Sequence, residues 1–354
     1  MMIWKNAERN LGAYRMSINR VNQYPISQLF DTDSKLIFEI PKYQREYTWG
    51  TAQWENLFDD LSENESGYFL GTIICIDTTF DAINAPKREV VDGQQRLTTL
   101  SILFAALYST LNQYRAQMSD DQQSDMLQLK RRLVLKGSQS QIRVVPQIQN
   151  NNLDDYKGVL SEQKIIAEHS MPKFAGVRRI KKAFEFFRKR LVKAIFDAKG
   201  TAANGQIVDP VSALNALSAI LEKVNSAVIV MIEVSNHADA YTLFESLNNR
   251  GTPLTAVDLI KNLLLARLDL SDGNNLDYYF LQWQQVLEFL GDDYSTQERF
   301  FRHNYNAFRK AMNVPFLKPD DTRQYALKPL ATRSNLLEIY EKISTRIQTD
   351  FWKL

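Results

Sequence analysis

The sequence predicts an α+β protein, with a mixed β-sheet and surrounding helices followed by an all-α helical segment. Three observations support this fold class. Short β-prone runs at 36–40, 68–76, 87–91 and 227–234 alternate with longer segments whose apolar residues recur at helical spacing. The run at 68–76 is almost continuously apolar, which is typical of a strand covered on both faces. From residue 276 onward only helical periodicity remains.

The composition is that of a chain with a sizeable apolar core, since 44% of its 354 residues are hydrophobic and 24% are charged. No apolar run approaches the roughly 20 residues that span a bilayer, and the N-terminus has no signal-peptide pattern, so we expect a cytoplasmic protein without membrane contact. Cys75 is the only cysteine, which rules out an intrachain disulfide. The net charge of +2 gives no global nucleic-acid signal, so any basic surface has to be local.

The other elements follow from local patterns. Residues 1–21 are expected to form a flexible leader, and Pro41 ends the first strand. Residues 133–146 read as a β-hairpin around a glycine turn. Helical spacing of apolar residues predicts helices at about 51–64, 94–114, 119–133, 173–199 and 210–224.

The densest polar motif follows the strand at 87–91. Asp92 and Gly93 form a turn, and a helix begins at Gln94. The unpaired N–H groups of a helix N-terminus suit a phosphate, and Gly93 lets the backbone approach a ligand closely. Arg96 can hold a phosphate with two donors, and Asp92 can hold Mg²⁺, a ribose hydroxyl or the turn itself. The alternative is an Asp-Gly turn before an ordinary amphipathic helix.

A second polar stretch, residues 40–49, follows the first strand. Tyr43, Gln44 and Arg45 combine an aromatic ring, an amide and a guanidinium, which together can stack on, bond to and neutralise a modified nucleotide. We therefore expect these three residues to sense modified DNA. The alternative is that Arg45 points into the nucleotide site.

The helix predicted at 173–199 is strongly basic, with ten Lys or Arg residues against two acidic ones. A solvated basic face and a surface for the DNA backbone both explain this pattern. On the second explanation, the expected backbone contacts are Arg178, Arg179, Lys182 and Arg190.

A third polar cluster lies at Asn248, Asn249, Arg250 and Gly251. Gly251 suits a left-handed helix cap, so a simple helix–turn–helix corner explains the pattern. The functional alternative is a polar knuckle that faces the Asp92 turn.

Several catalytic centres are missing from the sequence. His169, His237 and His303 are far apart, and no pair has metal-ligand spacing on a helix. No Gly-rich loop of the Walker type and no nucleophile elbow is present. Nuclease activity is therefore not expected from the residues of this chain.

Three of the motifs together carry a resemblance to a known family. Residues 40–49, 92–98 and 244–251 resemble the three signatures of the GmrS-type N-terminal domain of GmrSD-like modification-dependent (type IV) restriction systems, which act in anti-phage defence. The core of that domain is similar to the ParB/sulfiredoxin fold. The resemblance covers residues 22–268, and residues 269–354 are similar to the helical spacer that follows in these proteins.

The resemblance implies an NTPase that needs Mg²⁺, with the kind of NTP left open. It implies Asp92, Gln95 and Arg96 as catalytic residues, with Asp92 also as the metal ligand. The residues implied for nucleotide binding are Gly93, Gln94, Thr98, Thr99, Asn248, Asn249, Arg250 and Gly251.

The implied partners are modified double-stranded DNA, a His-Asn-His nuclease domain or subunit, and further copies of the chain in an oligomer. This sequence lacks the His-Asn-His centre. The nuclease then lies beyond a truncated end, or in a separate subunit, or cleavage has been lost. Two other activities remain open: a ParB-like nucleotide-gated DNA clamp without a nuclease, and a kinase on the same fold.

Overall fold

The computed structural model describes residues 18–41, 44–79, 85–138, 140–148, 151–197, 209–235, 276–291, 293–309 and 330–336, with scattered residues between 239 and 264 and between 339 and 343. The chain divides into two compact units, residues 18–235 and residues 1–17 with 236–354. Each unit has its own apolar core.

The first unit contains a six-stranded mixed sheet with the strand order β1-β6-β3-β4-β2-β5. The β1–β6 and β3–β4 pairs are antiparallel, and the other neighbours are parallel. The strands are β1 (Ile18–Pro25), β2 (Ile37–Glu39), β3 (Phe69–Asp77), β4 (Lys87–Asp92), β5 (Val144–Val145) and β6 (Val228–Val234).

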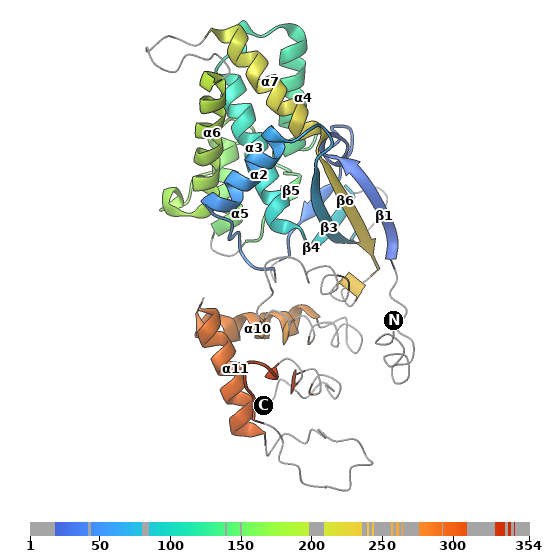
Figure 1. The fold of residues 1–354 in the computed structure, drawn as a ribbon, viewed down its shortest axis with the longest axis vertical. Helices are drawn as coiled ribbons and strands as arrows, with labels where there is room; N and C mark the ends of the chain where they lie inside the picture. The colour runs from blue at the N-terminus through green and yellow to red at the C-terminus, as the bar shows by residue number, and fades with distance from the viewer. Residues whose placement is uncertain are drawn as a thin grey trace. The chain divides into compact units, whose positions relative to one another are not determined.

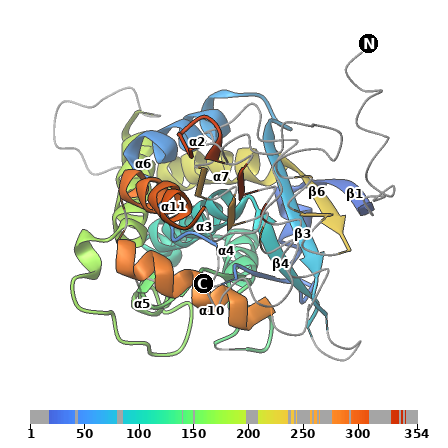
Figure 2. The same ribbon diagram turned by 90° about the horizontal axis from the view of Figure 1, so that it is seen from below.

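Helices cover one side of this sheet, as both views in Figures 1 and 2 show. They are α1 (Ile26–Leu29), α2 (Thr51–Glu63), α3 (Gln94–Asn112), α4 (Asp120–Leu133), α5 (Asn152–Glu162), α6 (Arg179–Asp197) and α7 (Pro210–Ser226). Short 3-10 helices lie at Arg115–Gln117 and Ala175–Val177.

Helix α3 is the centre of the helical layer and contacts α4, α5, α6 and α7. Its residues are buried from Gln94 to Leu111, with the exception of Arg96. Fully buried apolar side chains such as Leu97, Phe104 and Leu107 each stabilise the fold by about 1.5–3 kcal/mol. This packing fixes the N-terminus of α3, and with it the Asp92 turn, at the end of β4.

The second unit is described in part, and its named elements are the helices α10 (Leu276–Leu290) and α11 (Tyr294–Phe308). The ring of Trp283 stacks on Phe301, with 5.0 Å between the centroids. Tyr305 and Leu336 complete a buried aromatic and aliphatic cluster. The α+β prediction with a helical C-terminal part is confirmed. Within the described ranges, no helix is long and apolar enough to cross a bilayer.

One local prediction was wrong, and another was confirmed only in part. Residues 18–21 were assigned to a flexible leader, but strand β1 begins at Ile18 and pairs along its length with β6. The strand is polar and mostly exposed, so its stability comes from backbone pairing with β6 and not from an apolar pattern. The hairpin predicted at 133–146 is present only over residues 133–143, where an antiparallel bridge joins Val134 to Ile142. It ends there because Val144 and Val145 pair with β2 instead.

Candidate nucleotide site

The turn between β4 and α3 depends on glycine. Gly93 has φ 87°, a left-handed conformation that side chains disfavour. A Cβ at this position would lie 2.9 Å from Cγ1 of Ile73 and 3.2 Å from the carbonyl oxygen of Thr72. Gly93 therefore allows the turn to press against β3, and the predicted Asp-Gly turn is confirmed.

The N-terminus of α3 has no side-chain cap from the described residues. The first intrahelical bond runs from the amide of Leu97 to the carbonyl of Gly93, at 3.0 Å. The N–H groups of the first turn therefore remain available to an acceptor, and a 19-residue helix adds its positive dipole end. This is the geometry that favours an anion.

Arg96 lies flat against β3 beside this turn. Gly71 makes the approach possible, because a Cβ there would lie 2.8 Å from Nη2 of Arg96. Nη1 of Arg96 donates to the carbonyl oxygen of Thr72 at 3.0 Å. Burial lowers the pKa of Arg96, and the nearby Asp92 carboxylate opposes that shift. A guanidinium has five N–H donors, so the bond to Thr72 leaves donors for a ligand.

The Asp92 carboxylate is influenced electrostatically by two guanidinium groups. Burial raises its pKa above the usual 3.8, and the opposing influences are the N–H of Gly93, Arg96 and Arg45. Two cations around one carboxylate leave a net positive site, which suits phosphate oxygens. Within the described part of the chain, no three His, Cys, Asp or Glu residues gather as a complete metal site.

The comparison with known families gives the chain's relationship. Residues 26–265 match the family described as GmrSD restriction endonuclease, N-terminal domain, and this range is more than half of the chain. The chain belongs to this family. The GmrSD N-terminal domain is a component of type IV restriction systems, which target DNA. A comparison with curated proteins finds no match.

In this GmrSD domain, the loop before α2 is fastened to the Asp92 turn. Gln44 donates to the carbonyl of Val91 at 2.8 Å and accepts from Gln94 at 3.2 Å. The Gln44 amide is thus bonded inside the protein, which argues against its predicted role in sensing DNA. Arg45 is exposed and acts electrostatically on Asp92, which agrees with the alternative that it belongs to the nucleotide site. Tyr43 lies outside the described residues.

Three other predicted site residues belong to the packing of α3. Gln95 accepts from the amides of Thr48 and Trp49 and donates to the carbonyl of Glu46. Its side chain is 6% exposed, so it cannot act as the predicted catalytic group without leaving these bonds. Thr98 and Thr99 are also buried, and Thr99 bonds to Tyr47. Their neighbours in sequence are candidate site residues, but the helix turns these three side chains inward.

Two of the four predicted DNA contacts on α6 and the residue before it form internal ion pairs. Arg178 makes a bidentate pair with the fully buried Asp155, at 2.5 and 2.6 Å. Arg190 pairs with Asp59 of α2 and lies over the ring of Phe58. Arg179 and Lys182 are exposed, and neither forms an ion pair with another described residue. The corner at 248–251 lies within the family match but outside the described residues.

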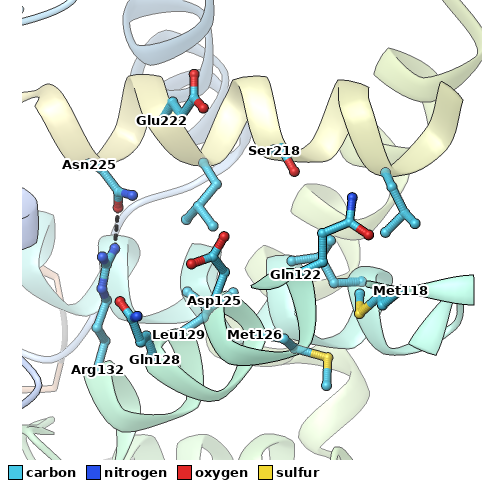
Figure 3. Close-up of a pocket in the computed structure, with 13 residues that line it drawn as sticks. Met118, Gln122, Asp125, Met126, Gln128, Leu129, Arg132, Ser218, Glu222 and Asn225 are labelled. Atoms are coloured by element: carbon cyan, nitrogen blue, oxygen red, sulfur yellow. Dashed lines mark hydrogen bonds between the residues drawn. The ribbon is translucent and has the colours of Figure 1, made fainter. Parts of the chain in front are cut away.

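A cavity of about 260 Å³ lies away from the turn, between α4 and α7. Figure 3 shows Asp125 and Gln122 of α4 opposite Ser218 of α7. At one end, Nη1 of Arg132 donates to Asn225 and the guanidinium lies over the ring of Phe104. No residue of the turn lines this cavity, so it is separate from the candidate nucleotide site.

Proposed function

We propose that this GmrSD domain binds an NTP with Mg²⁺ at the Asp92–Arg96 turn, hydrolyses it, and couples turnover to recognition of modified DNA. The observation that carries the proposal is the uncapped N-terminus of α3, with Arg96 fixed against β3 beside the Asp92 turn. The nuclease is supplied by another domain or subunit, of the His-Asn-His type.

The first turn of α3 supports phosphate binding. Phosphate oxygens accept hydrogen bonds from its free amides, and Arg96 adds charge-assisted bonds from a side chain already fixed against β3. Asp92 is the one carboxylate of the turn. A single carboxylate with nucleotide phosphates and water is a common environment for Mg²⁺, so the residues fit this ion. The ion would neutralise phosphate charge.

Hydrolysis transfers the γ-phosphoryl group to water. The water oxygen forms a bond to the γ-phosphorus, and the bond from that phosphorus to the bridging oxygen breaks. The products are NDP and inorganic phosphate, with the water proton released to phosphate or solvent. Arg45 and Arg96 would stabilise the charge that spreads over the phosphoryl oxygens, which is the main task in this reaction class.

A titration of the purified chain with Mg²⁺ and each NTP tests the binding step. Arg96→Ala removes a charge-assisted grip worth ~1.5–3 kcal/mol, so affinity should fall roughly 10- to 150-fold. Arg115→Ala is the matched control, because Arg115 is exposed and lies in the 3-10 helix after α3. If Arg96→Ala binds NTP like the wild type, the proposed site is wrong.

One observation favours a second function, that of a ParB-like DNA clamp that does not hydrolyse NTP. Gln95 is bonded on both ends of its amide, so it is not a free polar group for chemistry at the turn. A ParB-like clamp that binds NTP and DNA without turnover would need no such group. Phosphate release, measured with and without modified DNA, separates the two: release supports the NTPase, and tight NTP binding without release supports the clamp.

A further inference from the structure

Residues 44–50, which we call the clamp segment, are held to α3 by side-chain amides at two points. Gln44 is bonded to Val91 and to Gln94, at the start of the segment. Gln95 holds its middle by three bonds to backbone groups: 2.8 Å from the amide of Thr48, 3.3 Å from the amide of Trp49, and 2.8 Å to the carbonyl of Glu46. Arg45 stands between these two attachments.

A buried chain of hydrogen bonds adds a further attachment. The indole N–H of Trp54 donates to the hydroxyl of Tyr47 at 2.7 Å, and Thr99 donates to the carbonyl of Gln95 at 2.7 Å. Thr99 has one hydroxyl proton, so Tyr47 must donate to Thr99 across the 2.7 Å between them. Burial raises the pKa of Tyr47 far above its usual value, so the proton stays on Tyr47.

These contacts fix the backbone of Arg45 relative to helix α3. Arg45 itself is exposed, and a long exposed side chain samples many rotamers. Its backbone, however, lies between two residues that are bonded to Val91 and to Gln95. Because Gln44 is bonded to Val91 and to Gln94, which flank Asp92 and Gly93 in the chain, Arg45 lies beside the Asp92 turn.

We infer that Gln95 is a positioning residue whose task is to hold Arg45 over the phosphates of the bound nucleotide. This inference rests on the proposed function and specifies how the site is built. Arg45 contacts the nucleotide, and Gln95 acts only through the clamp segment. The inference assigns Arg45 to the nucleotide site rather than to the sensing of modified DNA.

A double-mutant cycle on the full chain tests the inference, with phosphate release at saturating Mg²⁺ and NTP as the readout. Arg45→Ala should lower kcat about 10- to 100-fold, the range for removal of a charge-assisted bond. Gln95→Met, which keeps the side-chain length, should lower kcat to a similar extent. The kcat of the double variant should be at most about twofold below that of the slower single variant, because both changes remove the same interaction.

The result that overturns the inference is multiplication of the two effects, or an Arg45→Ala variant with wild-type turnover. Thr110→Val is the structural control, since Thr110 is buried on the same helix and bonds to the carbonyl of Ala106. Its effect should multiply with that of Arg45→Ala. If Gln95→Met does not fold, Tyr47→Phe breaks the hydroxyl chain and takes its place in the cycle.

The cycle separates this inference from the proposed function. A wild-type chain that binds no NTP contradicts the proposed function itself. A chain that binds NTP without turnover leaves the cycle intact, with the dissociation constant as the readout and the same expectation of non-additive effects. A chain with normal turnover and additive effects contradicts the role of Gln95 alone.

Discussion

The Asp92 turn and helix α6 both stand out in the sequence as dense polar regions, but the fold treats them differently. At the turn, side-chain amides bond to backbone groups, and Arg45 and Arg96 act electrostatically on the Asp92 carboxylate. On α6 and the residue before it, Arg178, Lys181 and Arg190 pair with acidic residues of α5 and α2. Counting charges along the sequence thus overestimates the positive field of α6.

This contrast shows what decides whether a basic residue is available. Asp155 and Asp59 lie 23 and 131 residues from their partners, so a window on the sequence cannot find them. Arg96 has its carboxylate four residues away, in the same turn, and keeps donors to spare. Arg178 and Arg190 are thus engaged by distant acidic residues, whereas Arg96 keeps donors for a ligand.

The largest expected effect is a loss of stability when the buried ion pair between Arg178 and Asp155 is broken. Arg178→Ala leaves the fully buried carboxylate of Asp155 without its bidentate partner, which should cost about 3–5 kcal/mol of the free energy of unfolding. Urea denaturation measures this loss. The exposed Lys182→Ala should stay within about 0.5 kcal/mol of the wild type. Equal stability of the two variants would mean that Arg178 is free to contact DNA, as the sequence suggested.

A smaller change in stability is expected when Asp92 is replaced, and it should be a gain and not a loss. Because burial raises the pKa of Asp92 in the folded state, protonation of this group favours folding. That contribution is complete below the ordinary pKa of 3.8 and is lost as the pH rises through the raised value. At neutral pH, the ionised carboxylate therefore costs stability.

Asp92→Asn should accordingly stabilise the chain at neutral pH, while it abolishes NTP binding that depends on Mg²⁺. Thermal denaturation at pH 7 and calorimetric titration measure the two effects. Asp33→Asn, at a carboxylate that is 80% exposed, is the control and should change neither. A less stable Asp92→Asn variant would indicate that the carboxylate only holds the turn.

The smallest effect is expected on the exposed face of α6. Replacing Arg179 and Lys182 by Ala should weaken binding of all DNA alike and lower the slope of log affinity against log salt by about one unit for each phosphate that the variant no longer binds. Gel-shift titrations at several salt concentrations measure the slope. Lys130→Ala on α4 is the control, since its amine donates to the carbonyl of Lys164. An unchanged slope in the double variant would show that α6 is a solvated basic face.

The sequence was most informative where local chemistry decides the structure. The Asp-Gly turn and the start of α3 depend mainly on residues within five positions of each other, whereas the placement of Arg96 also depends on Gly71 and Thr72 of β3. The roles of Gln95 and Thr99 depend on the clamp segment, which is about 50 residues away in the chain. One signal was present: the apolar residues that surround α3 on all sides predict a fully buried helix, whose polar side chains must bond internally.

Strand β1 was missed for a related reason. Its polar residues satisfy no apolar alternation, and its place in the sheet comes from pairing with β6. Edge pairing of this kind leaves no pattern in a single sequence, because the backbone groups that form it are the same for every residue.

Because Gln95 accepts hydrogen bonds from the backbone amides of Thr48 and Trp49, these two amides indicate whether the clamp segment is attached to α3. The N–H groups of Thr48 and Trp49 have a side-chain oxygen as their acceptor and belong to no helix or strand. Their exchange with deuterated water therefore requires release of the clamp segment, and it does not require unfolding of the sheet. Slower exchange at these two positions on addition of nucleotide would show, without any label, that the bound nucleotide holds the clamp segment in place.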